Sequence, residues 1–101
     1  MEEIYEAGLA KAIGVSNWTI PGLQSMLQYA KIKPAMNQVE MHPLLPNSEL
    51  LEFCSAHDIL LSAYSPLGKL SEGKRLSAIP ELTQIAERHG HTLAQILIAW
   101  G

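Results

Sequence analysis

Four side chains with hydrogen-bonding or stacking chemistry lie at or near the ends of three short apolar runs. Ser16 and Asn17 follow the first run, Gln38 lies in the second and Tyr64 ends the third. Asn and Gln amides each donate and accept hydrogen bonds, and a Ser hydroxyl does either, so together they complement a primary carboxamide. An aromatic ring beside them could stack on a flat heterocycle. Amide partners plus a stacking ring suit a nicotinamide, although these residue types alone are not specific for one.

The three apolar runs at 12–15, 35–39 and 59–64 have the length of strands buried on both faces, as in a parallel sheet. Helical patterns alternate with them, which predicts an α/β fold. In such folds ligands bind at the carboxyl ends of the strands, so the polar residues are expected on one rim. The helix boundaries are predicted from candidate caps at Thr19, Asn47 or Ser48, Gly90 and Thr92 with Gln95. The stretch 68–77 is predicted to be a long loop.

Composition restricts the class of protein. The 101 residues suit one small domain, and 48% hydrophobic with 17% charged residues indicates a chain that forms a core. A net charge of −3 argues against a nucleic-acid or anionic-membrane partner, and no run reaches the length of a membrane-spanning helix. The N-terminus lacks the order of a secretory signal. Because Cys54 is the single cysteine, neither an internal disulfide nor a multi-cysteine metal site is expected, and we predict a cytoplasmic protein.

Other reactive side chains have structural interpretations. Glu40 and His42 are two apart and could ligate a metal, but the adjacent proline and the lack of further ligands favour a structural role. His89 and His91 flank a predicted helix end, where histidine interacts favourably with the helix dipole. No metal site is therefore predicted. Trp18 is expected either to line a substrate pocket or to cover the rim.

Three stretches carry a resemblance to a known family: KAIGVSNW at 11–18, NQVEMHPLLPNSELLEFC at 37–54 and LSAYSPLGK at 61–69. In this order and spacing they resemble the aldo-keto reductases, whose fold is a (β/α)8 TIM barrel that binds NADPH. The resemblance covers essentially the whole chain. It implies a partial barrel of roughly strands five to seven with their helices, forming one incomplete domain over residues 1–101.

The resemblance also implies roles for individual residues. Ser16, Asn17 and Gln38 stand where the family binds the nicotinamide carboxamide. Tyr64 stands where a tyrosine stacks on the nicotinamide ring. A loop that contacts the cofactor's pyrophosphate is implied for Ser65, Leu67, Gly68 and Lys69. The last of these replaces a serine of many members, and a cation there would suit a pyrophosphate.

For each of these positions a plainer interpretation stands beside the cofactor role. Ser16 and Asn17 could be turn and cap residues between a strand and a helix. Gln38 could be a satisfied core amide, and Tyr64 a core aromatic residue.

The resemblance assigns no catalytic residue to this chain. The family's catalytic tyrosine, lysine, aspartate and histidine come from the first four strands, and its 2′-phosphate motif follows the eighth. We therefore expect part of an NADPH-dependent oxidoreductase that reduces aldehydes or ketones to alcohols, with the isolated chain inactive. Three parallel strands leave unpaired edges, so self-association is also expected. The alternative is a non-catalytic cofactor-binding or interaction module, similar to potassium-channel beta subunits or a truncated product.

Overall fold

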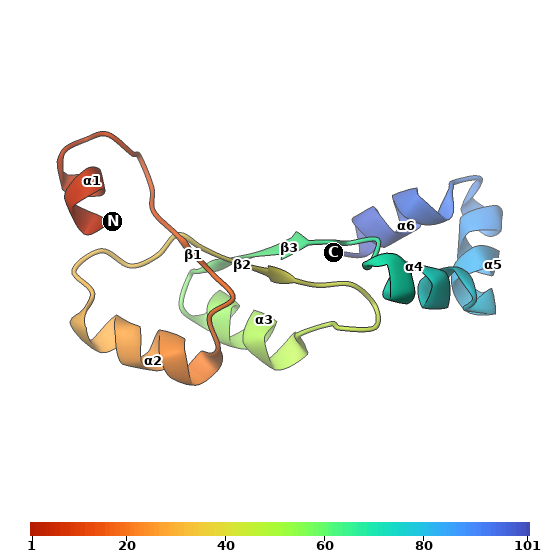
Figure 1. Cartoon of the computed structure of the whole chain (residues 1–101), viewed down its shortest axis with the longest axis horizontal. Helices are drawn as coiled ribbons and strands as arrows, with labels where there is room; N and C mark the ends of the chain where they lie inside the picture. The colour runs from red at the N-terminus through yellow and green to blue at the C-terminus, as the bar shows by residue number, and fades with distance from the viewer. The chain divides into compact units, whose positions relative to one another are not determined.

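The computed structural model describes residues 1–101 as six helices and three strands (Figure 1). The helices are α1 (Glu2–Glu6), α2 (Ile20–Tyr29), α3 (Ser48–Ala56), α4 (Leu70–Ser77), α5 (Pro80–His89) and α6 (Leu93–Trp100). The strands are β1 (Val15–Ser16), β2 (Met36–Glu40) and β3 (Leu60–Tyr64). The chain divides into two compact units. We call Met1–Val39 with Asn47–Ser62 the sheet unit, and Glu40–Pro46 with Ala63–Gly101 the helical unit.

The sheet has the order β1-β2-β3, with β1 parallel to β2. Val15 faces Asn37 and Ser16 faces Gln38 in this register. The α/β fold with a parallel sheet is thus confirmed. β1 is shorter than the predicted run 12–15, because regular pairing begins only at Val15.

In the sheet unit, α2 and α3 lie on one side of the sheet (Figure 1). Along β2, Asn37 and Val39 are buried whereas Gln38 between them is exposed. This alternation shows that the residues of this chain cover one face of β2. Gln38 lies on the other face and is exposed.

The core of the sheet unit joins α2 and α3 to the strands. Its fully buried or nearly buried members are Leu23, Met26, Cys54 and Ile59. α2 begins after Thr19, which has the extended backbone of an N-cap, and Pro21 occupies the first turn as predicted. The predicted start of α3 at Asn47 or Ser48 is also confirmed. Helix spacing in the sequence thus located both covering helices.

A carboxylate at the start of α1 binds a distant loop of the same unit. Oε1 of Glu2 accepts hydrogen bonds from the backbone N–H groups of Lys31 and Ile32, at 2.7 and 2.8 Å. The bond from Ile32 contributes most to holding the pKa of this carboxyl below its ordinary value. α1 is therefore attached to the connection between α2 and β2 by a charge-assisted contact.

The helical unit contains α4, α5 and α6, each of which buries one residue: Leu76, Ala86 and Leu97. Gly90 ends α5 with a φ of 64°, and Thr92 and Gln95 form the predicted capping box of α6. Both predicted helix boundaries are confirmed.

The prediction of a long loop over 68–77 is wrong, because α4 occupies Leu70–Ser77. Leu76 is 0% exposed while Leu70 is 89% exposed, so the helix has no apolar stripe that the sequence could reveal. Its charges suit a helix instead, with Glu72 in the first turn and Lys74 and Arg75 in the last.

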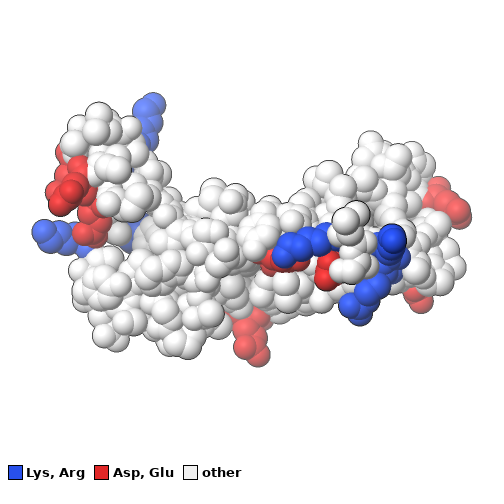
Figure 2. All heavy atoms as spheres, viewed as in Figure 1, with Lys and Arg blue, Asp and Glu red and all other residues white.

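Most of the face drawn in Figure 2 is uncharged, and in places Lys or Arg side chains lie directly beside Asp or Glu side chains. Of the six helices, none combines the length and apolarity that a membrane crossing requires.

Candidate cofactor-binding residues

The structure brings Ser16, Asn17 and Gln38 together at the end of the β1–β2 pair. The Ser16 hydroxyl donates to the backbone carbonyl of Gln38 at 2.8 Å, and the backbone N–H of Asn17 donates to the same oxygen at 2.9 Å. Ser16 of β1 and Asn17, which follows β1, thus converge on one residue of β2. All three residues are exposed.

Asn17 ends β1 by adopting the left-handed conformation, with a φ of 58°. Asparagine tolerates this region better than most residues, which explains its place between a strand and a helix. The interpretation of Ser16 and Asn17 as helix caps is wrong, since Thr19 is the N-cap of α2. Asn17 is nevertheless a turn residue, and this turn sets where its side-chain amide lies.

These three side chains fit a carboxamide chemically. The Gln38 amide stands on the exposed face of β2 and offers both a donor and an acceptor. The Ser16 hydroxyl uses its proton on Gln38 and keeps its acceptor capacity. The strand end therefore presents complementary groups for a ligand that has one C=O and one NH2.

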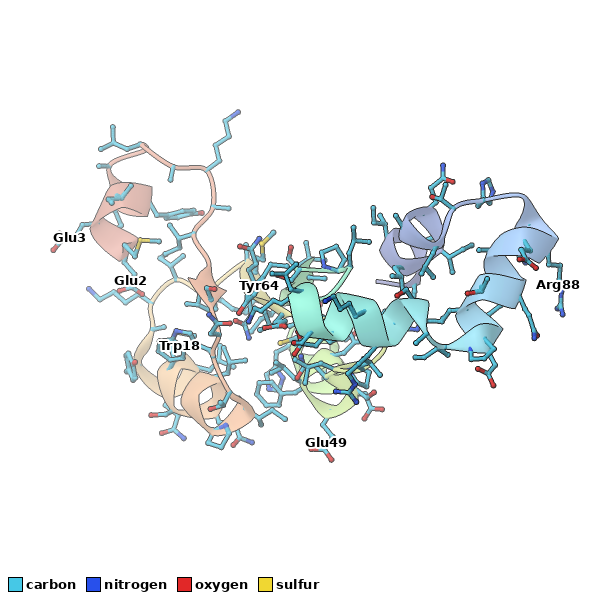
Figure 3. All side chains as sticks on the ribbon, turned by 45° about the vertical axis from the view of Figure 1, so that its right-hand side comes forward. Glu2, Glu3, Trp18, Glu49, Tyr64 and Arg88 are labelled. Atoms are coloured by element: carbon cyan, nitrogen blue, oxygen red, sulfur yellow. The ribbon has the colours of Figure 1, made fainter.

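Asn37, beside Gln38, interacts with the turn from the covered face. Its Nδ2 donates to the carbonyl of Trp18 at 3.0 Å, and its Oδ1 accepts from the N–H of Trp18 at 3.3 Å. Trp18 lies in the connection between β1 and α2 (Figure 3). It packs partly buried against the core of the sheet unit.

The remaining candidates lie in the helical unit, in one continuous segment that begins at the last residue of β3. Tyr64 is the last residue of β3 and is half-buried. A tight turn follows, in which the Gly68 N–H donates to the Ser65 carbonyl at 2.8 Å. Ser65 and Gly68 have φ values of 50° and 72°, and Leu67 between them is exposed. The loop leads directly into the first turn of α4.

Gly68 is required here for space as well as for its backbone conformation. A Cβ at this position would lie 2.9 Å from the Cβ of Glu72 and 2.9 Å from the backbone nitrogen of Gly73. Both distances are shorter than side chains allow, and one of the atoms belongs to the α4 backbone. Only glycine lets this loop run so close to the helix.

Lys69 forms an ion pair within the helical unit. Its Nζ lies 2.6 Å from Oε2 of Glu40, whose Oε1 lies 3.4 Å from Nε2 of His42. The Lys69 hydrogen bond is the main reason that the pKa of Glu40 lies below its ordinary value, and Glu40 in turn raises the pKa of Lys69. The cation is therefore held at the start of α4 by a carboxylate of β2.

The predicted structural role of Glu40 and His42 agrees with this arrangement. His42 is 2% exposed, and its backbone pairs with Leu45 across a short bridge. Nowhere in the chain do three or more His, Cys, Asp or Glu side chains converge as metal ligands would.

The candidates thus form two groups, each within one unit. Ser16, Asn17 and Gln38 converge in the sheet unit. The helical unit contains the segment of Tyr64, Ser65, Leu67, Gly68 and Lys69.

Sequence analysis missed two contributors, Asn37 and the pairing of Glu40 with Lys69. An asparagine inside a strand pattern is itself a signal, because asparagine is depleted from strands. The ion pair joins residues 29 positions apart, and nothing local in the sequence indicates it.

Comparison with known proteins decides the family. The sequence model described as "Aldo/keto reductase family" matches residues 1–101. The chain belongs to the aldo/keto reductase family. The resemblance found in the sequence is thereby confirmed over the whole chain.

Individual aldo/keto reductases are similar to the chain along its length. Glycerol 2-dehydrogenase (NADP(+)) of Hypocrea jecorina is 60% identical over 105 residues, which cover 100% of this chain and 33% of that protein. Glyoxal reductase of Bacillus subtilis (strain 168) is 42% identical over 99% of the chain and 35% of its own length. The chain spans about a third of the length of the curated relatives it matches.

Solved aldo/keto reductase structures share the fold. The enzyme MGS-M4 from a Medee basin deep-sea metagenome library superposes with a TM-score of 0.94 at 41% identity, over 98% of this chain and 36% of its own. Aldose reductase from Giardia lamblia gives a TM-score of 0.88 at 40% identity, over 99% and 33%. The chain therefore has the fold of about a third of an aldo/keto reductase.

Proposed function

We propose that this chain is part of an NADPH-dependent oxidoreductase that reduces a small aldehyde or ketone to an alcohol. In this proposal it supplies nicotinamide-binding residues from strands five to seven of a (β/α)8 barrel. The observation that carries the proposal is the convergence of Ser16, Asn17 and Gln38 at one strand end of an aldo/keto reductase chain. The naming of a similar protein as NADP(+)-dependent supports the choice of cofactor.

In the proposed complex the strand end holds the carboxamide. The Gln38 side chain is exposed and offers both a donor and an acceptor to it. The Asn17 side chain, placed by the left-handed turn, is proposed to contribute a further hydrogen bond. Ser16 contributes an acceptor, since its proton is used on Gln38. Two or more bonds to one planar group would fix the rotation of the nicotinamide.

The segment after β3 is proposed to bind the rest of the reactive half of the cofactor. Tyr64 stacks on the nicotinamide ring. Backbone and side chains of Ser65, Leu67 and Gly68 line the pyrophosphate. Lys69 contributes a positive charge that Glu40 keeps in place.

NADPH, when bound, supplies the hydride for carbonyl reduction. The residues of this chain bind and orient the cofactor, and none of them is proposed as the proton donor. The isolated chain is accordingly proposed to be inactive, as one incomplete domain of a cytoplasmic enzyme. Its sheet edges are proposed to make it prone to self-association.

The test is an NADPH titration followed by tryptophan emission. The chain has two tryptophans, so Trp100→Phe leaves Trp18, next to Asn17, as the reporter. We expect saturable quenching in this background. We also expect Gln38→Leu to weaken the affinity about 3- to 10-fold, because it removes one or two hydrogen bonds. Gln28→Leu, which removes an exposed amide on α2, is the matched control and should not change the affinity.

Two results would contradict the proposal. Quenching no greater than that of free N-acetyltryptophanamide would mean that NADPH does not bind near Trp18. Equal affinities for Gln38→Leu and Gln28→Leu would mean that the strand end does not receive the carboxamide.

A further inference from the structure

Asn37 is a buried amide in the middle of β2, and its side chain is 0% exposed. Asparagine is depleted from strands, and burying an amide costs free energy unless its donor and acceptor are both hydrogen bonded. Val39, two positions along on the same face, shows the residue type that packs there without this cost. Packing alone therefore does not explain the choice of asparagine.

The amide satisfies both of its polar ends on the backbone of one residue, Trp18. Nδ2 donates to the Trp18 carbonyl at 3.0 Å, and Oδ1 accepts from its N–H at 3.3 Å. Trp18 lies beyond the paired part of β1, where the last backbone bond runs from Asn17 N–H to the Gln38 carbonyl. The side chain thus continues the pairing of the two segments for one more residue after the strands separate.

This contact lies on the far side of the left-handed turn. Asn17 has a φ of 58°, so the chain turns away from β2 at this point and Trp18 cannot join the ladder. The N–H of Asn17 is fixed by Gln38, and the next residue is fixed by Asn37. With both of its ends held, the turn fixes the backbone from which the Asn17 side chain extends.

We propose that Asn37 is a positioning residue that holds Asn17 and Ser16 in the conformation that receives the cofactor's carboxamide. This rests on the proposed function of the strand end. Asn37 itself does not touch the ligand, since its side chain is buried on the covered face of β2. Its effect is to make binding at the nicotinamide end stronger by preorganising the turn.

Asn37→Asp tests the two hydrogen bonds between residue 37 and Trp18 reversibly, because aspartate keeps the shape of the asparagine side chain. An ionised carboxylate still accepts from the Trp18 N–H but has no proton for the Trp18 carbonyl. Lowering the pH protonates the buried carboxyl and restores the donor. The titratable side chain in contact with Asn37 is Cys54, and burial raises the pKa of that thiol, so it stays neutral throughout.

The measurement compares two ligands on the 101-residue chain by calorimetry. NADP+ and 2′-phospho-ADP-ribose carry the same phosphates, and only the first has a nicotinamide. The ratio of their dissociation constants therefore reports on the nicotinamide end alone. We expect Asn37→Asp to reduce this preference for NADP+ about tenfold at pH 8, with recovery toward pH 5. Asn47→Asp, the same change at the N-cap of α3, should leave the ratio unchanged at both pH values.

The outcomes separate this inference from the proposed function. If the wild-type chain shows no preference for NADP+, the proposed function fails and the positioning role fails with it. If the wild type shows the preference and Asn37→Asp keeps it at pH 8, only the positioning role is overturned. Hydrogen exchange of Asn37→Leu gives a readout without ligand: this variant removes the acceptor of the Trp18 N–H, so the Trp18 amide should exchange faster than in the wild type while the Leu23 amide keeps its protection. Equal exchange of the Trp18 amide in both proteins would also overturn the inference.

Discussion

We expect Gly68→Ala, in the loop before α4, to lower the free energy of unfolding by more than the loss of glycine's backbone freedom alone would. Gly68 has a φ of 72°, and an added Cβ would lie 2.9 Å from the backbone nitrogen of Gly73 in α4. Gly90 is a matched control in the same unit, because its φ is 64° and nothing lies within 4 Å of the corresponding Cβ. The two substitutions therefore share the backbone penalty, and only the first adds a steric clash.

The magnitudes follow from these two terms. A non-glycine residue in the left-handed region costs about 1–2 kcal/mol, which is the loss of unfolding free energy expected for Gly90→Ala. Overpacking against an ordered backbone costs about 1–3 kcal/mol more, so Gly68→Ala should be less stable than Gly90→Ala by that amount. Urea unfolding followed by far-ultraviolet circular dichroism measures both values.

Binding provides the second half of the test. To relieve the clash, the loop of Ser65–Gly68 must move away from α4, and NADP+ affinity should fall for Gly68→Ala while Gly90→Ala retains it. Equal destabilisation of the two variants would refute the steric argument. Unchanged affinity in a destabilised Gly68→Ala would refute the role of this loop conformation in cofactor binding.

Three further outcomes are expected. The hydrogen bond from Lys69 is the main reason that the pKa of Glu40 lies below its ordinary value of 4.5, so the stability that Glu40 contributes is present above its unfolded-state pKa and is lost as the pH falls through its folded-state pKa. Glu40→Gln should therefore flatten the dependence of the unfolding free energy on pH below about pH 4.5. An unchanged pH dependence in that range would contradict this. Asn17→Gly keeps the left-handed turn without its amide, so NADP+ affinity should fall about 3- to 10-fold while the unfolding free energy changes by less than about 1 kcal/mol. Leu23→Ala, at a fully buried position, should lower the unfolding free energy by about 2–5 kcal/mol. Leu9→Ala, at an 80% exposed position, should change it by less than about 0.5 kcal/mol. Similar losses in the two variants would show that the cluster around Leu23 is not the core.

Local sequence signals predicted most elements of the fold. Pro21 in the first turn of α2, Gly90 at the end of α5 and the Thr92–Gln95 capping box of α6 each act within a few residues, so local signals revealed helix boundaries that the structure confirms. α4 was missed because it buries a single leucine, Leu76. A helix without an apolar stripe has no periodic signal to detect.

The sequence by itself determined the family and the residue types available at each strand end. Three motifs in order identify an aldo/keto reductase, and the amides, the hydroxyl and the aromatic ring follow from them. Whether these groups converge is a matter of pairing between distant segments.

Only the tertiary structure showed that Ser16 and Asn17 share the Gln38 carbonyl, that Asn37 reaches across to Trp18, and that Glu40 holds Lys69. Each of these contacts joins residues 19 to 29 positions apart. The register of β1 against β2 and the left-handed turn decide the first two contacts, and the path of the chain from β2 through β3 to the start of α4 decides the third. The physical reason is that pairing between distant segments in space is not specified by any local pattern of residues.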